Sequence, residues 1–173
     1  MMNKEEFAQA ANYWHERDAV AKKMPREELQ AEILRVIGAN NTCALATGCG
    51  DFVRCTPIEY SYNDGCFWLF SEGGEKFRAL AENANVSLAI YAHYAGFDKL
   101  ESLQVMGRAE VVDAFSLRYN EQLAKKGLSP DAVRRMPHAL HLICIQPSRF
   151  ECLCAAFKKR GYDSRQTYAV AAK

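Results

Sequence analysis

The chain has 173 residues, of which 49% are hydrophobic and 25% are charged, with 22 Lys and Arg against 21 Asp and Glu. These values are typical of a globular domain and exclude collagen-like, mucin-like and mostly disordered proteins. The net charge of +1 provides no basic surface for nucleic acid or an anionic membrane, and no uncharged apolar run approaches the ~20 residues of a membrane span. Because the first six residues are polar and acidic, unlike a signal peptide, we expect a cytoplasmic protein.

Two helices are expected at the N-terminal end, over residues 3–24 and 25–38. The first has a moderate apolar stripe among charged residues, made of Phe7, Ala10, Ala11, Trp14, Ala21 and Met24. The second begins at Pro25 and ends near Gly38, residue types that favour a helix start and stop. Its apolar residues fall on one face and are Leu29, Ile33, Val36 and Ile37.

After residue 41 the pattern changes to short apolar runs separated by turn signals. Six runs are typical of strands: residues 42–47, 52–62, 66–71, 86–91, 100–112 and 141–146. Asn63-Asp64-Gly65 predicts a hairpin turn, and residues 149–153 either continue the sixth strand or form a seventh. Short helices are expected over 75–82 and 115–126 and after Ser129.

This order of elements predicts one domain, of mainly β class with flanking helices. Strands joined mostly by hairpins favour an antiparallel sheet, and six of them favour a barrel. The domain would span residues 1–173, with N-terminal helices over about 3–38 and a C-terminal tail over about 155–173. Pro57 cannot donate to a strand ladder, so it indicates an edge, a bulge or a strand break, and Gly107 is a candidate interruption of the fifth strand.

The segment FSEGGEKFR, residues 70–78, is the most informative motif. A strand ends in Ser71, passes through Gly73 and Gly74, and enters a helix that carries Lys76 in its first turn. A hydroxyl, close backbone N–H groups and an ammonium together can hold a phosphate. An ordinary strand–turn–helix with a solvated lysine is the alternative, since such turns are common.

Two further segments could contact a planar heterocycle. In Arg54-Cys55-Thr56-Pro57, strand alternation places Arg54 and Thr56 on one face and Cys55 on the other. Pro57 ends local pairing and leaves backbone polar groups that a ring could use. Gln104 lies in an apolar strand, and its carboxamide offers both a donor and an acceptor. An edge strand with an exposed arginine is the alternative for the first segment. For Gln104, a cross-strand bond or plain exposure is the alternative.

Together these segments resemble the pyridoxamine 5'-phosphate oxidase-like family of FMN-binding split barrels, in its flavin-reductase-type branch near the nitroimidazole-resistance proteins. The resemblance covers about residues 26–150 and depends on the succession of a helix, NTCALAT, RCTPIEYSYNDGCFWLFSEGGEKFRALAENANVSLAIY and LQVMGRAEVV. It implies a six-stranded split barrel and a homodimer with two FMN molecules between the subunits.

The resemblance also implies a role for each site residue. The segment Arg54, Cys55, Thr56 and Pro57 would pass along the isoalloxazine ring, and Phe70 and Ser71 would continue toward the ribityl phosphate. Lys76 would bind the phosphate, and Gln104 would contact the flavin from a neighbouring long strand. No catalytic side chain and no metal site are expected, and NAD(P)H is the candidate electron donor for reduction of a small substrate.

The chain departs from the true oxidases at three places. Glu75 stands where they carry a second cation at the phosphate helix, and Glu59 stands where they carry a lysine for the substrate phosphate. Their C-terminal Arg-x-His motif is not visible in residues 150–166. We therefore expect an FMN-dependent oxidoreductase that is not a true pyridoxamine phosphate oxidase.

Two other functions fit the same scaffold. A haem-binding or haem-degrading module would need an axial ligand, for which His93, His138 and His141 are the candidates. A non-catalytic flavin-binding redox sensor would use some of the seven cysteines. Their odd number and the lack of zinc-like spacing indicate buried, reduced thiols.

Overall fold

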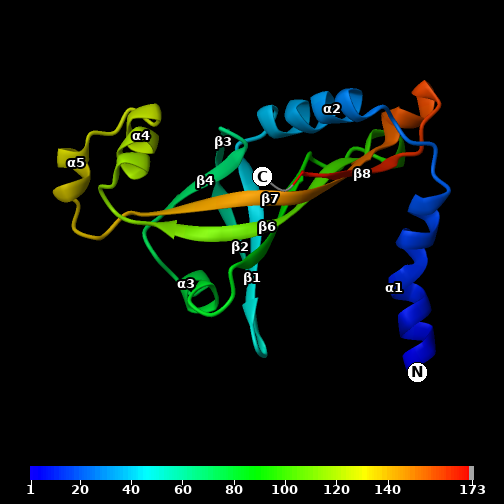
Figure 1. Cartoon of the computed structure of the whole chain (residues 1–173), viewed down its shortest axis with the longest axis horizontal. Helices are drawn as coiled ribbons and strands as arrows, with labels where there is room; N and C mark the ends of the chain where they lie inside the picture. The colour runs from blue at the N-terminus through cyan, green and yellow to red at the C-terminus, as the bar shows by residue number, and fades with distance from the viewer. Residues whose placement is uncertain (172–173) are drawn as a thin grey trace.

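The structure, a computed structural model, describes residues 1–171. One antiparallel sheet of eight strands curls into an open barrel with helices on its flanks (Figure 1). The strands are β1 (Thr42–Cys49), β2 (Phe52–Glu59), β3 (Ser61–Asn63), β4 (Cys66–Ser71), β5 (Asn85–Tyr91), β6 (Glu101–Val112), β7 (His141–Cys154) and β8 (Arg165–Ala169). The α-helices are α1 (Lys4–Ala19), α2 (Arg26–Gly38), α3 (Lys76–Leu80), α4 (Leu117–Lys125) and α5 (Pro130–Arg134), and two 3₁₀ helices are η1 (Phe97–Lys99) and η2 (Ala155–Arg160).

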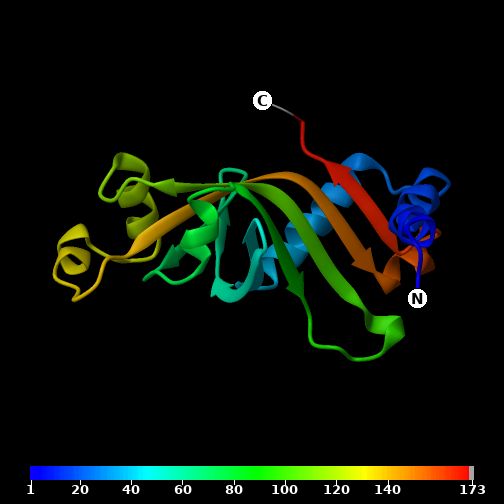
Figure 2. The same cartoon turned by 90° about the horizontal axis from the view of Figure 1, so that it is seen from below.

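The strand order shows where the barrel is open. Paired neighbours run β2-β1-β5-β6-β7-β4-β3, and β8 pairs with the far part of β7 (Figures 1 and 2). Within residues 1–171, β2 and β3 are the two ends of this path and do not pair with each other. The fold is therefore a mainly β split barrel with flanking helices, as the sequence predicts. Pro57 lies on the edge strand β2, where its missing N–H costs no ladder bond.

The number of strands is eight rather than the six expected. The predicted strand 52–62 divides into β2 and β3 at Tyr60, whose side chain turns into the core and whose hydroxyl donates to the carbonyl of Ile37 at 2.8 Å. The predicted strand 141–146 and residues 149–153 form the single long strand β7.

Residues 165–169, within the predicted C-terminal tail, form the strand β8. Tyr168 pairs with Phe150 of β7, and the side chain of Gln166 is fully buried. Its amide oxygen accepts from the N–H of Met24 at 2.9 Å and its amide nitrogen donates to the carbonyl of Lys22 at 3.0 Å. The end of the chain is thus fastened to the segment between α1 and α2. Residues 172 and 173 of the predicted tail lie outside the described part.

The main core lies between α2 and one face of the sheet, which we call the inner face. The expected apolar face of α2 is buried there, and its residues are Leu29, Ile33, Val36 and Ile37. Alternate residues of the strands point to them, such as Leu45 of β1, Leu88 of β5 and Val105 of β6. A smaller core around Trp68, Tyr119 and Leu123 lies under α4.

The structure also tests the predictions made for Gly107 and for the first helix. The predicted interruption of the fifth strand at Gly107 is wrong, because β6 runs unbroken through it. The β6–β7 register shifts there because Ser148 of β7 is an extra, unpaired residue between Pro147 and Arg149. The expected first helix ends at Ala19 rather than residue 24, and none of its residues is buried. No helix within residues 1–171 combines the length and apolar character needed to cross a bilayer.

Candidate functional site

Lys76 is buried in the first turn of α3, with only 6% of its surface exposed. Its ammonium donates to the carbonyl of Gly73 at the preceding turn. Within the described residues, no carboxylate lies within ion-pair distance of it. Because a buried charge without a counter-charge is costly, this lysine is unlike an ordinary solvated surface side chain.

The turn before Lys76 has a backbone that only glycine adopts readily. Gly73 and Gly74 have φ angles of 139° and 104°. The N–H of Gly73 donates to the hydroxyl oxygen of Ser71 at 3.2 Å, which fixes the end of β4 against the turn. Since α3 has only five residues, its N-terminus contributes little dipole, and the site depends on the turn and on side-chain cations.

Arg54 supplies a second cation beside Lys76. Burial and then the nearby charge of Arg54 lower the pKa of Lys76 below its ordinary value. Arg54 lies on β2 in register with Thr47 of β1, on the face that carries Thr56. Like Lys76, it has no carboxylate partner among residues 1–171. Arg78 does not join them, because its guanidinium stacks on the ring of Phe52 at 4.7 Å.

An open pocket of about 610 Å³ lies between β2, the end of β4 and the glycine turn. Five of the eight predicted site residues line it: Thr56, Pro57, Phe70, Ser71 and Lys76. The remaining lining residues are Ile58, Glu72, Gly73, Gly74 and Leu140. The lining thus combines one cation, Lys76, and the hydroxyls of Thr56 and Ser71 with apolar side chains, while Arg54 lies near Lys76 outside the lining. A cation and hydroxyls beside apolar surface suit a phosphate attached to a planar group.

Cys55 and Gln104 lie elsewhere in this chain, on the outer face of the sheet. Cys55 pairs with Ala46, and Gln104 on β6 pairs with Ala89 of β5. Strands β1 and β5 separate β2 from β6, so a single chain does not bring Gln104 to the pocket. The predicted alternation of Arg54 and Thr56 against Cys55 is confirmed.

Sequence reasoning missed two polar groups near the site. Thr47 is buried opposite Arg54, and its hydroxyl has no hydrogen-bond partner within the described residues. The sequence signal for Thr47 was a hydroxyl-bearing residue within a mostly apolar strand. At the rim, His138 Nε2 lies 3.1 Å from Glu72 Oε1, an interaction that joins segments 66 residues apart and that no local pattern reveals.

The other candidate haem ligands do not face the pocket. His141 packs against Phe77, with 4.9 Å between ring centroids, and His93 is exposed in the loop after β5. Within residues 1–171, no group of three or more His, Cys, Asp or Glu side chains is placed to hold a metal ion.

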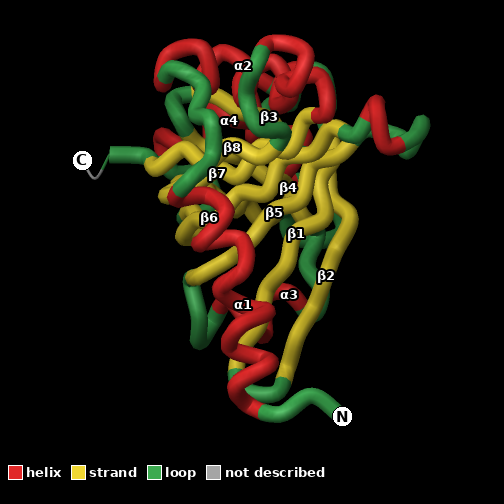
Figure 3. The backbone as a smooth tube through the Cα atoms, turned by 90° about the vertical axis from the view of Figure 1, so that its right-hand side faces the viewer, coloured by secondary structure: helices red, strands yellow, loops and turns green. Residues whose placement is uncertain are grey.

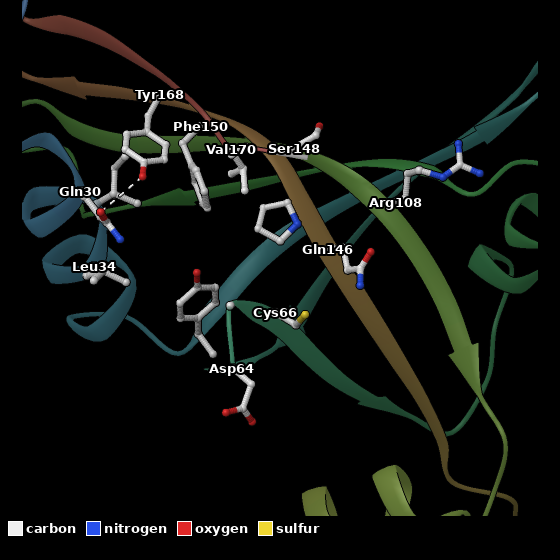
Figure 4. A pocket seen from close by; sticks show the side chains of 15 residues that line it. Gln30, Leu34, Asp64, Cys66, Arg108, Gln146, Ser148, Phe150, Tyr168 and Val170 are labelled. Carbon is white, nitrogen blue, oxygen red and sulfur yellow. Dashed lines mark hydrogen bonds between the residues drawn. The ribbon is translucent and has the colours of Figure 1, made fainter. Parts of the chain in front are cut away.

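A second pocket, of about 580 Å³, lies between α2, the β3–β4 hairpin, β7 and the segment after β8 (Figure 4). Its wall is mostly apolar and aromatic and includes Leu34, Phe150, Tyr168 and Val170. The Tyr168 hydroxyl donates to Gln30 at 3.3 Å across one end. None of the eight predicted site residues lines this pocket.

A family model described as pyridoxamine 5'-phosphate oxidase matches residues 29–154, which include both edges of the first pocket. The chain belongs to this family. Among curated proteins, none matches its sequence.

Three solved structures illustrate the likeness. A FAD-binding protein from Mesorhizobium loti is 22% identical with a TM-score of 0.58, covering 76% of this chain and 95% of that one. The heme storage protein HutZ from Vibrio cholerae is 19% identical with a TM-score of 0.58, covering 69% and 89%. A protein assigned to 5-nitroimidazole antibiotic resistance from Bacteroides thetaiotaomicron is 17% identical with a TM-score of 0.56, covering 69% and 80%. At these identities the likeness shows the shared fold of this oxidase family and not a shared activity.

Proposed function

We propose that this chain binds FMN in the pocket between β2 and the glycine turn and acts as an FMN-dependent oxidoreductase on a small substrate. The observation that carries the proposal is the pair of cations Lys76, which lines the open pocket, and Arg54, which lies near it: among residues 1–171, neither has a carboxylate within ion-pair distance. A bound phosphate would supply the missing negative charge.

Different residues of this chain would bind different parts of the nucleotide. Lys76 and Arg54 would bind the phosphate, and the Gly73–Gly74 turn would let the backbone approach it closely. Phe70, Thr56 and Pro57 would line the path of the remaining nucleotide and exclude water from one side of it. When bound, the flavin would supply the electron-transfer chemistry, with NAD(P)H as the proposed donor.

A homodimer would complete the site. Gln104 and Cys55 both lie on the outer face of the sheet, and Gln104 is three strands away from β2 in its own chain. If the outer faces of two subunits meet, Gln104 of one subunit can approach the ring held at the β2 edge of the other. This dimer remains a proposal, and the expected cytoplasmic location remains a prediction.

Haem binding is less well supported by the site. Neither of the two pockets described above has a histidine in its lining, and His138 is engaged with Glu72 at the rim of the first. The likeness to HutZ is one of fold, as is the likeness to the FAD-binding protein.

The direct test is titration of the purified protein with FMN and with riboflavin, which lacks the phosphate. We expect FMN to bind more tightly than riboflavin by about ten- to a hundredfold, the effect of a charge-assisted contact of about 1.5–3 kcal/mol. Equal affinity would contradict the phosphate site. Bleaching of the bound flavin by NAD(P)H and reoxidation by an electron-poor substrate would support turnover, whereas bound flavin that no donor reduces would indicate a sensor or store.

A further inference from the structure

Helix α1 is a well-formed helix with nothing packed over most of its surface. Its first turn has a complete capping box, in which the side chain of Asn3 accepts from Glu5 and Glu6 and the Glu6 carboxylate accepts from Asn3. None of its 16 residues is buried. Because an isolated helix of this length is marginal in water, packing against another surface would be needed to hold it.

The exposed side chains of α1 include large aromatic ones. Phe7 is 62% exposed, and Tyr13 and Trp14 are each 50% exposed. Phe7, Ala10, Ala11 and Trp14 follow the spacing of one helix face, so they form a continuous apolar stripe. This stripe is the one expected from the sequence, but the chain's own core does not cover it.

Only the C-terminal end of α1 is fastened to the domain. The guanidinium of Arg165 lies 4.7 Å from the ring centre of Trp14, and Asp18 accepts from the Thr167 hydroxyl at 3.2 Å. From there the helix runs away from β8, so that the half carrying Phe7 extends past the domain (Figures 1 and 3). The apolar stripe is thus partly covered at its Trp14 end and uncovered at its Phe7 end.

Helix α1 extends on the same side of the sheet as the outer face. α2 lies on the inner face, and α1 extends from the opposite side of the sheet (Figures 1 and 3). On the outer face, Val53 is 79% exposed and Tyr91 is 63% exposed, and small residues such as Ala46 and Ala89 leave it open. Two apolar surfaces of the same chain, a helix stripe and a sheet face, therefore lack cover on the same side.

We propose that α1 is an arm that packs its Phe7–Ala11 stripe against the outer sheet face of a second copy of this chain. In a twofold dimer each subunit gives one arm and receives one, so both uncovered surfaces are buried in equal number. The proposal rests on the homodimer of the proposed function and extends it, because the arm would pack on part of the partner's outer face, the face that also carries Gln104.

The charge of α1 argues against a membrane as its partner. The helix carries four acidic residues (Glu5, Glu6, Glu16 and Asp18) and two basic ones (Lys4 and Arg17). Helices that lie on anionic membranes are rich in Lys and Arg on their polar face. The stripe itself is uncharged, so it suits the apolar residues of the outer sheet face, such as Val53 and Tyr91, better than an anionic bilayer.

The test compares two variants in sedimentation velocity of the full chain over a range of concentrations. Phe7→Asp places a charge on the stripe, and Gln9→Asp places the same charge about 200° around the helix, on the opposite side. We expect Phe7→Asp to raise the dimer dissociation constant by about tenfold or more, as for a buried apolar anchor, and Gln9→Asp to leave it unchanged.

Amide hydrogen exchange of residues 4–14 gives a second readout. We expect these amides to be protected when the protein is dimeric and to lose protection on dilution. Equal dissociation constants for wild type and Phe7→Asp, a chain that stays monomeric, or protection that does not change with concentration would each overturn the proposal. Binding to vesicles of phosphatidylserine and phosphatidylcholine that Phe7→Asp abolishes would also overturn it.

FMN titration of the same samples separates this proposal from the proposed function. A Phe7-dependent dimer that binds no FMN would retain the arm and reject the flavin site. A dimer that binds FMN and is indifferent to Phe7→Asp would retain the flavin site and reject the arm.

Discussion

Arg54 on β2 and Lys76 on α3 are close enough for the charge of Arg54 to lower the pKa of the Lys76 ammonium, and no carboxylate within the described residues offsets either cation. Two like charges beside a buried turn destabilise a fold unless an anion joins them. Departures from self-consistent packing of this kind are typical of functional sites. The pair is therefore best explained as half of a site whose other half is a ligand.

Replacing Lys76 by methionine tests that relationship. Lys76→Met keeps the apolar stem and removes the charge, so FMN affinity should fall by about ten- to a hundredfold while riboflavin affinity stays the same. Lys99→Met, at an exposed position in η1, is the matched control and should change neither affinity. A parallel loss of FMN and riboflavin binding would show that Lys76 supports the pocket rather than the phosphate.

The lowered pKa of Lys76 predicts how FMN binding depends on pH. The free protein releases the Lys76 proton below the ordinary pKa of 10.5, whereas a bound phosphate favours the charged form and raises that pKa again. Binding therefore takes up a proton, and affinity falls as pH rises through the lowered pKa of the free protein toward 10.5. Affinity measured by fluorescence titration across that range should show this fall in wild type and a smaller fall in Lys76→Met. The same slope in both would contradict the assignment.

The same shift affects stability with the opposite sign. In the absence of a ligand, the unfolded chain holds the Lys76 proton more tightly than the folded one, so stability rises as pH increases through the lowered pKa toward 10.5. Saturating FMN should reduce or reverse this trend, because it restores the ammonium in the folded state.

The cysteines predict a simple pattern of thiol reactivity. Burial raises the pKa of Cys43, Cys144 and Cys152 to about 12, which leaves almost no thiolate at neutral pH, whereas Cys55 is exposed on β2. With an aromatic disulfide reagent we expect one fast-reacting thiol in the folded protein at dilutions where it is monomeric, lost in Cys55→Ser, and seven in denaturant. Fast reaction of a buried thiol would favour a redox-sensing role.

The sequence predicted those parts of the site that are local in the chain. Strand alternation placed Arg54 and Thr56 on one face, and the glycine turn placed Ser71 and Lys76 at one end of β4. Pro57, which has no backbone N–H to donate, favoured an edge strand, and β2 is an edge strand of the sheet. Each of these inferences needs only a few consecutive residues.

The rest depended on contacts between distant segments. Gln104 is separated from the pocket because β1 and β5 come between β2 and β6, a strand order that no local pattern gives. β8 looked like a polar tail because its stability comes from pairing with β7 and from the buried amide of Gln166, which bonds to the backbone of Lys22 and Met24. The stripe of α1 was visible, but the absence of cover over it within this chain was not.

Gly107 gives a test of the barrel itself. At this bulge β6 lies so close to β7 that an added Cβ would meet the carbonyl oxygen of Gln146 at 2.5 Å and a methyl group of Ile145 at 3.1 Å. Because both neighbours belong to a central strand, Gly107→Ala should lower the free energy of unfolding by about 1–3 kcal/mol, as overpacking does. Gly38→Ala is the matched control: a Cβ there meets nothing within 4 Å, and the backbone does not have a positive φ. This control should leave the free energy of unfolding unchanged or raise it by about 0.4–1 kcal/mol, because alanine lowers the conformational entropy of the unfolded chain. Urea denaturation followed by circular dichroism measures both. A Gly107→Ala variant as stable as wild type would mean that β6 and β7 are not held as closely at this bulge as the fold requires.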